Sequence, residues 1–158
     1  MNDDERWMEE AIAEARRAAA LGEVPVGAVV VRGGAAIGRA FNRRETDGDP
    51  TAHAEMLALR QAARAVGGWR LEGCAIYVTL EPCAMCAGAL VASRVATLVF
   101  GADDPKGGFC GSLGDLARHP RLNHRLEVRS GVLEATCSGL LKEFFTALRR
   151  PPGEPTVL

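Results

Sequence analysis

Two short motifs constrain the fold of this chain more than any other feature, because their side chains are suited to meet at one point. His53-Ala54-Glu55 precedes Pro82-Cys83-Ala84-Met85-Cys86, and Cys83 is thirty positions after His53. One imidazole and two thiolates suit Zn²⁺, and three protein ligands leave a fourth tetrahedral position for water. The sequence therefore predicts a fold that brings His53, Cys83 and Cys86 together around one zinc ion.

Bulk properties favour a single globular domain and exclude several classes of protein. The chain has 158 residues, 47% hydrophobic and 25% charged, both ordinary for a folded domain. No apolar run reaches the ~18 residues of a membrane span, and the acidic start Met1–Glu5 is unlike a signal peptide, so we expect a cytoplasmic location. Five cysteines argue against a disulfide framework. A net charge of −1 means that any nucleic-acid binding must depend on a local basic patch.

The hydrophobic pattern alternates between helices and strands along the chain. We expect helices at residues 3–21, 50–66, 83–93, 113–118 and 133–148, and strands at 26–31, 35–42, 75–80, 96–102 and 126–129. This order predicts an α/β protein, with three α/β/α layers around a central mixed five-stranded sheet. Residues 1–150 form the single predicted domain, and residues 151–158 form a short loose tail.

Glu55 is the predicted catalytic residue. It follows His53 by two positions, about 200° around an ideal helix, so we expect it beside a zinc-bound water and not on the zinc. Zinc lowers the pKa of its water towards ~7, and the resulting hydroxide would attack an amine-bearing carbon while Glu55 shuttles protons. Such a site needs an amidine-like carbon, as in cytosine, adenine or guanine. The zinc motif alone does not choose among these bases.

A structural zinc site is the alternative interpretation of the same residues. It would need a fourth protein ligand. The available candidates are Cys74, Cys110, Cys137, His119 and His124. None of them has a recognised metal-binding spacing.

His53-Ala54-Glu55 and Pro82–Cys86 together resemble the signature of zinc-dependent nucleobase deaminases. Further segments resemble the bacterial tRNA-specific adenosine deaminases, the TadA family, from about residue 5 to residue 150. These segments are Glu23–Ala28, Asn42-Arg43, Asp49–Glu55, Val78–Ala89, Val99–Ala102, Asp104, Lys106, Gly111–Leu113, Asn123-His124 and Phe144-Phe145. Thr146 departs from the family, which commonly has a basic residue after the two phenylalanines.

The resemblance implies a cytidine deaminase-like fold, a homodimer and one Zn²⁺ per subunit. It implies hydrolytic deamination of the wobble adenosine to inosine in the anticodon loop of an arginine tRNA. Asn42 would bond the flipped base, Val26 and Ala54 would line its pocket, and Asp104, Lys106 and Asn123 would lie around it. Phe145 would press on the anticodon loop.

A basic stripe is expected to bind tRNA phosphates. Arg118, Arg121, Arg125 and Arg129 lie in a stretch whose one acidic residue is Glu127, and Arg149 and Arg150 follow on the last helix.

Two further hypotheses remain beside tRNA editing. A free base or nucleoside deaminase of the guanine or cytosine type would share the zinc motif but would not need Asn123, Phe145 or the arginine stripe. A non-catalytic zinc-stabilised binding module would replace the water with a fourth protein ligand.

Overall fold

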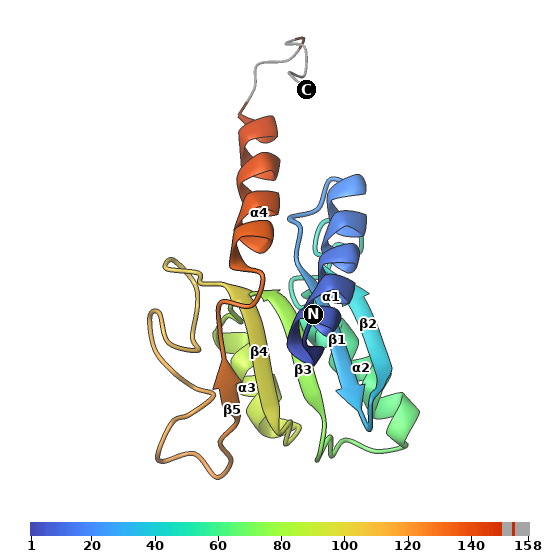
Figure 1. Cartoon of the computed structure of the whole chain (residues 1–158), viewed down its shortest axis with the longest axis vertical. Coiled ribbons are helices and arrows are strands. Elements are labelled where there is room, and N and C mark those ends of the chain that lie inside the picture. Colours follow the sequence, from blue (N-terminus) through green and yellow to red (C-terminus); the bar gives the residue numbers. More distant parts are fainter. Residues whose placement is uncertain (150–152, 154–158) are drawn as a thin grey trace.

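A mixed five-stranded sheet forms the centre of the molecule (Figure 1). The computed structural model describes residues 1–149 and Gly153. The strand order is β2-β1-β3-β4-β5, comprising β1 (Gly27–Arg32), β2 (Ala35–Phe41), β3 (Ala75–Leu80), β4 (Thr97–Ala102) and β5 (Glu127–Arg129). β1 runs antiparallel to β2 and β3, whereas β3, β4 and β5 are parallel.

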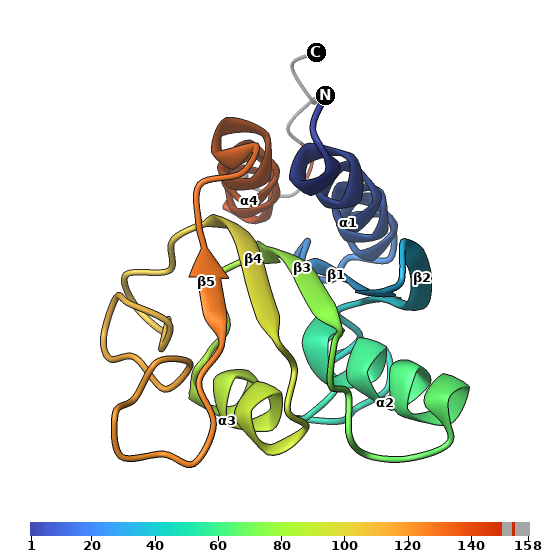
Figure 2. The ribbon, with the colours of Figure 1, turned by 60° about the horizontal axis from the view of Figure 1, so that its bottom comes forward.

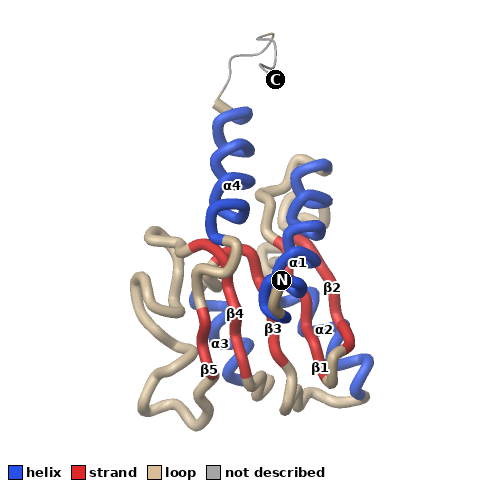
Figure 3. Tube along the Cα trace, in the orientation of Figure 1, coloured by secondary structure: helices blue, strands red, loops and turns tan. Residues whose placement is uncertain are grey.

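Helices cover both faces of this sheet (Figures 2 and 3). One face carries α1 (Asp3–Ala20) and α4 (Glu134–Leu148), and the other carries α2 (Ala54–Val66) and α3 (Ala84–Ala92). The predicted three-layer α/β/α fold with a mixed five-stranded sheet is therefore confirmed. Among the described residues, no helix combines the length and the apolar character that crossing a bilayer requires.

The alternation of side chains along the strands divides the core into two layers. On β1, Ala28 and Val30 pack towards α2 and α3, whereas Val29 and Val31 pack towards α1 and α4. Glycines allow the closest approaches of helix to strand. A Cβ atom on Gly27 would lie 2.0 Å from the carbonyl oxygen of Ala11, and one on Gly38 would lie 2.4 Å from that of Ala58. Helices α1 and α2 therefore contact the backbone of the β1–β2 hairpin.

The predicted start of the second helix is wrong. We expected Asp49-Pro50 to open it, but α2 begins at Ala54 and His53 is its N-cap residue. The Asp49 carboxylate instead accepts hydrogen bonds from the amide and the hydroxyl of Thr51, both at 2.8 Å. This local turn competes with helix formation, as hydrogen bonds from aspartate side chains to nearby groups often do. The helix therefore begins only after His53.

The helix predicted at residues 113–118 does not form. Its amide groups bond to loop partners instead of to a helical turn: Leu113 donates to the carbonyl of Gly108 and Leu116 to that of Phe109, both at 2.9 Å. The segment consists of turns, bends and one isolated bridge residue, Asp115, which pairs with Cys110. Residues 103–126 thus form one irregular connection between β4 and β5.

Candidate active site

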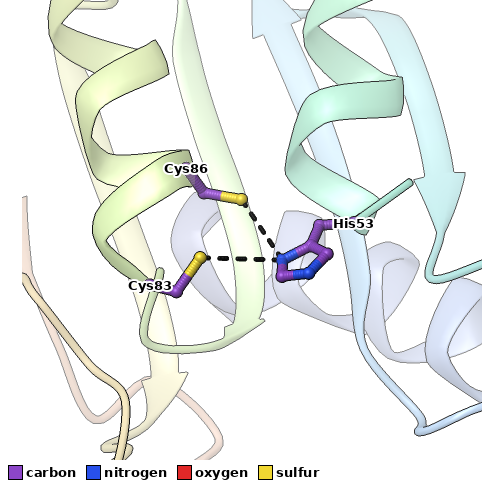
Figure 4. Close-up of side chains that lie close together, drawn as sticks. All are labelled: His53, Cys83 and Cys86. Atoms are coloured by element: carbon purple, nitrogen blue, oxygen red, sulfur yellow. Dashed lines mark hydrogen bonds between the residues drawn. The ribbon is translucent and has the colours of Figure 1, made fainter. Parts of the chain in front are cut away.

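The first turns of α2 and α3 place His53, Cys83 and Cys86 beside one another (Figure 4). His53 is the N-cap residue of α2 and Cys83 is the N-cap residue of α3. Each sulfur lies 3.6 Å from Nδ1 of His53, and all three ligand atoms lie within 4.8 Å of one another. Neither side chain makes a capping hydrogen bond, and Figure 4 shows both side chains directed to the shared centre.

The donor set of this cluster fits Zn²⁺, which binds imidazole nitrogen and thiolate sulfur in tetrahedral sites. Among residues 1–149, no fourth histidine, cysteine, aspartate or glutamate joins the cluster. None of the five candidates for a closed structural site is therefore within reach. Three protein donors leave one coordination position open, which is the pattern of a catalytic site.

Proton sharing within the cluster favours charge on Cys83. Hydrogen bonds from the Cys86 thiol and then from His53 lower the pKa of Cys83 to about 4. The neighbouring Cys83 sulfur and then burial raise the pKa of Cys86. The hydrogen bond to Cys83 raises the pKa of His53. The lowered pKa favours the thiolate form of Cys83, which is the form that binds a metal cation, and a bound cation would take the place of the shared protons.

Glu55 lies in the first turn of α2, next to a small cavity of about 180 Å³. Its side chain is buried, and burial raises the pKa of its carboxyl group. The cavity is lined by residues 24, 26, 42, 44, 53, 54, 55, 80, 81, 83 and 104. Pockets for drug-sized ligands occupy ~300–1,000 Å³, so this one matches a smaller ligand such as a single base.

Four of the predicted substrate-contact residues line this cavity, namely Val26, Asn42, Ala54 and Asp104. Asn42 also supports the backbone around it: its amide nitrogen donates to the carbonyl of Val24 at 3.2 Å, and its oxygen accepts from the amide of Arg44 at 3.1 Å. Asn42 is therefore both a turn residue and part of the pocket wall. Those two bonds hold its side chain in one orientation.

The other predicted contacts lie outside the cavity. Lys106 and Asn123 are exposed on loops, and Arg149 is exposed at the C-cap of α4. Phe145 is 42% exposed on α4, which extends beyond the sheet in Figure 1. Arg150 lies outside the residues that the structure describes. Lys106, Asn123, Phe145 and Arg149 are therefore not part of the pocket wall.

The expected arginine stripe is partly neutralised. Arg118 pairs with Asp115 at 2.7 Å, and Arg129 pairs with Asp4 of α1 at 2.7 Å as well as with Glu127 at 2.8 Å. Asp4 is 125 positions before Arg129, so the local sequence did not reveal it. The positive charge of these two arginines is therefore partly compensated within the protein, and their contact with tRNA phosphates stays a prediction.

Sequence reasoning missed Glu81, which organises one wall of the site. Its carboxylate is buried and accepts from the amides of Asp104, Cys110 and Ser112 at 3.0, 3.1 and 3.0 Å, and from the Ser112 hydroxyl. A Cβ atom on Gly108 would lie 2.2 Å from the Glu81 carboxyl carbon. Glu81 thereby fixes loop 103–113 against the start of α3.

Glu23 has the same role on the opposite wall and was also missed. It is buried and accepts from the amides of Glu45 and Thr46 at 3.0 and 2.7 Å, which holds loop 43–49. Each glutamate is the one charged residue of a short apolar stretch that contains a proline, Glu23-Val24-Pro25-Val26 and Leu80-Glu81-Pro82. A single charge in such a stretch indicates a buried, hydrogen-bonded carboxylate, because an unpaired one would be costly.

Cys110 is buried in the loop that Glu81 holds, and burial raises the pKa of its thiol to about 12. Its amide donates to Glu81, while its side chain packs into the core beneath the sheet. Cys110 therefore contributes a neutral apolar side chain and a backbone anchor to the loop.

The fold and the site together define a hydrolytic deaminase with a cytidine deaminase-like architecture. The family model described as MafB19-like deaminase matches residues 2–149. The chain is 57% identical to a tRNA-specific adenosine deaminase of Bacillus subtilis, over 95% of this chain and 93% of that protein. It is 48% identical to the protein of the same name from Haemophilus influenzae, over 92% and 85% of the two chains.

Solved structures agree with these relatives. A chain from a study of tRNA:A34 deaminases, which perform A-to-I editing at the wobble position, superimposes with a TM-score of 0.83 and 44% identity, covering 86% of this chain and 99% of that chain. A guanine deaminase from Nitrosomonas europaea gives a TM-score of 0.76 at 27% identity, over 92% and 86% of the chains. The chain belongs to the tRNA-specific adenosine deaminase family.

Replacing Glu81 by glutamine should loosen loop 103–113. The substitution turns one acceptor oxygen into a donor that faces backbone amides, so buried amides lose their partner. We expect the free energy of unfolding to fall by about 1–3 kcal/mol. Hydrogen exchange at the Cys110 and Ser112 amides should accelerate, as mass spectrometry of the loop peptide would show.

Glu23→Gln is the matched control, since it should accelerate hydrogen exchange at the amides of Glu45 and Thr46 and leave exchange in loop 103–113 unchanged.

The stabilisation by Glu81 should also depend on pH. Burial raises the pKa of Glu81, but hydrogen bonds from Ser112, Asp104 and Cys110 outweigh this effect and hold the pKa below 4.5. Stabilisation by Glu81 is thus present above pH 4.5 and lost as the pH falls through the lowered pKa. Unchanged loop exchange in Glu81→Gln would contradict the anchoring role.

Proposed function

We propose that this chain converts the wobble adenosine in the anticodon loop of an arginine tRNA to inosine, by zinc-dependent hydrolysis. The observation that carries the proposal is the buried Glu55 beside the His53, Cys83 and Cys86 cluster, in a cavity the size of one base. The 57% identity with a tRNA-specific adenosine deaminase supports the substrate. A tRNA substrate also leads us to propose a cytoplasmic location.

His53, Cys83 and Cys86 are the proposed ligands of one Zn²⁺ per subunit. When bound, zinc supplies the Lewis acidity that makes water a nucleophile near neutral pH. Glu55 accepts a proton from the attacking water and delivers it to the ring nitrogen next to the amine-bearing carbon. It then takes the remaining proton of the hydroxyl group added to that carbon and transfers it to the departing amine, so that adenosine and water yield inosine and ammonia. A carboxyl group whose pKa is raised by burial is suited to transfers in both directions.

The walls of the pocket determine how the base is held. Asn42 offers hydrogen bonds to an extruded base, with Val26 and Ala54 against its faces. Asp104, Lys106 and Asn123 are proposed to contact the flanking nucleotides, and Phe145, Arg149 and Arg150 the outer part of the loop. Anticodon-loop bases suit such a pocket because unpaired bases can be extruded at little cost.

Deamination of a free purine base is the second candidate. Similarity to a guanine deaminase, with a TM-score of 0.76, and the small cavity favour it. A free base would fill the pocket without using Asn123, Phe145 or Arg149. The two candidates therefore differ in their need for RNA.

An arginine-tRNA anticodon stem-loop with adenosine at the wobble position tests the proposal directly. We expect the zinc-loaded protein to form inosine in this RNA, while free adenosine, cytidine and guanine remain unchanged in parallel reactions. Nuclease digestion followed by liquid chromatography would quantify inosine. Deamination of free guanine with an inert stem-loop would support the second candidate and overturn the first.

Glu55→Gln should separate proton transfer from metal binding. Turnover should fall by about 10²–10⁴-fold, the typical contribution of general acid–base catalysis, while bound zinc stays at the wild-type amount. Cys86→Ala is the contrasting variant, because loss of a ligand should remove zinc and destabilise the fold. Metal analysis after gel filtration gives both values. Loss of zinc in Glu55→Gln would exclude the assigned role of Glu55.

We further propose that two copies pair through an apolar hollow on the face of α2 and α3. This hollow has a volume of about 330 Å³ and is lined by Met56, Leu59, Trp69, Leu71 and Ala89, among others. Trp69 is 55% exposed and lines the hollow together with these apolar residues, and contiguous exposed apolar surface is typical of an interaction site. The resemblance to the TadA family, which implies a homodimer, supports a second copy as the occupant.

Trp69→Ala should shift the protein from dimer to monomer in sedimentation velocity experiments. The reason is the loss of buried apolar area at the centre of the proposed interface. Leu21→Ala is the matched control, since Leu21 is 53% exposed but lies outside the hollow. Equal sedimentation of both variants with the wild-type protein would contradict this interface.

A further inference from the structure

A polar hollow, separate from the active-site pocket and from the apolar hollow on α2 and α3, lies beside β2, the strand at one edge of the sheet. Figure 2 shows this strand between α1 and α2. The hollow has a volume of about 400 Å³. Five arginines line it, from both helices, the strand and the loop that follows it: Arg17, Arg39, Arg43, Arg60 and Arg64. One acidic residue, Glu14, lies in the same lining. This positive charge is concentrated in one place on a chain whose net charge is −1.

Three of these arginines have acidic partners. The pairs are Arg17 with Glu14 at 3.2 Å, Arg43 with Asp47 at 3.1 Å, and Arg39 with Glu10. Arg60 and Arg64 take part in no ion pair among the described residues. Arg60 does contribute to the lowered pKa of Asp49, but less than the hydrogen bonds from Thr51. Two guanidinium groups in the hollow are therefore available to an external anion.

Phe41 holds two of the paired arginines in the same hollow. The guanidinium carbon of Arg17 lies 5.0 Å from the centre of the Phe41 ring, and that of Arg43 lies 5.4 Å from it. Phe41 is buried, so the ring is a fixed platform. Stacked arginines lose less conformational freedom when they bind phosphate, because their planar groups are already oriented. The hollow thus combines unpaired and pre-oriented guanidinium groups.

The hollow and the active-site pocket share one segment of chain. Asn42 and Arg44 line the pocket, whereas Phe41 and Arg43 line the hollow. On α2, Leu57 in the hollow lies one helical turn beyond His53 at the pocket. The hollow therefore adjoins the pocket along this segment, so the phosphates of a strand whose base fills the pocket are the candidate ligands of the arginines. A free base would leave these arginines without a ligand.

We propose that this arginine-lined hollow binds phosphodiester groups of the same RNA strand whose adenosine occupies the pocket, chiefly through Arg60 and Arg64. The inference rests on the proposed function, because it extends the tRNA site along the edge of the sheet. Guanidinium groups form bidentate hydrogen bonds with phosphate, which suits this lining. Phosphate contacts position the strand and supply most of its affinity without reading the base sequence.

Arg64→Gln is the primary test, together with the double variant Arg60→Gln, Arg64→Gln. Arg64 is the cleaner probe, because Arg60 also lines the apolar hollow proposed for the dimer. Each variant would be combined with Glu55→Gln so that the RNA is not consumed. Fluorescence anisotropy with a labelled anticodon stem-loop would give Kd between about 50 and 200 mM salt, the range in which phosphate contacts strongly affect affinity.

We expect Kd to rise several-fold and the slope of log Kd against log salt to decrease by about 0.7 for each phosphate that the variant no longer neutralises. Arg32→Gln is the matched control. It removes one exposed positive charge at the end of β1 farthest from Val26, and should leave both quantities unchanged. In proteins that retain Glu55, the Arg64→Gln variant should raise KM while kcat at saturating RNA stays near wild type.

A salt slope in both arginine variants equal to that of Arg32→Gln would overturn the inference. Thermal unfolding and sedimentation of each variant show that an altered Kd does not come from misfolding or from loss of the dimer. The proposed function is decided separately, by whether the wild-type protein forms inosine in the stem-loop. If the wild-type protein edits the RNA and the arginine variants bind it as tightly as the wild type, the proposed phosphate-binding role of the hollow is refuted and the proposed function stands.

Discussion

The approach of two helix N-termini to one point is the constraint on which the site depends. α2 and α3 begin directly after His53 and Cys83, and neither side chain caps its own helix. The first amide groups of both helices therefore give partial positive charge to the centre, which favours thiolates there. The pKa of Cys83, about 4, follows from direct bonds to Cys86 and His53 in this setting. The rest of the fold holds these helix ends in place.

Two buried carboxylates connect that rigid centre to the loops that form the walls of the pocket. Glu81 holds loop 103–113 and Glu23 holds loop 43–49, each through backbone amides. Loops carry much of substrate recognition in enzymes, but they do so only when a scaffold fixes their position. In this protein, the carboxylates of Glu81 and Glu23 accept the hydrogen bonds of loop amides that no neighbouring strand accepts. The arginine-lined hollow continues from loop 43–49 and is proposed to use the same support.

Local patterns predicted the regular elements well and the irregular ones poorly. Strand β3 was predicted with its observed bounds because Ala75–Leu80 is short, apolar and β-branched. The helix at 113–118 was wrong because its amides bond to residues in the same loop, and its pattern of hydrophobic residues does not show this. The start of α2 was wrong because the Asp49 side chain bonds Thr51. In both cases a few local hydrogen bonds prevent helix formation, and the period of hydrophobic residues in the sequence does not reveal them.

The sequence by itself determined the family, the layered fold and the three residues of the candidate metal cluster, since these follow from short motifs and from the period of hydrophobic residues. Only the tertiary structure decided which charges remain free. Arg129 is paired with Asp4, 125 positions away, and Arg118 with Asp115, whereas Arg60 and Arg64 face a hollow without an acidic partner among the described residues. Charges act through distance in space, and the fold sets that distance.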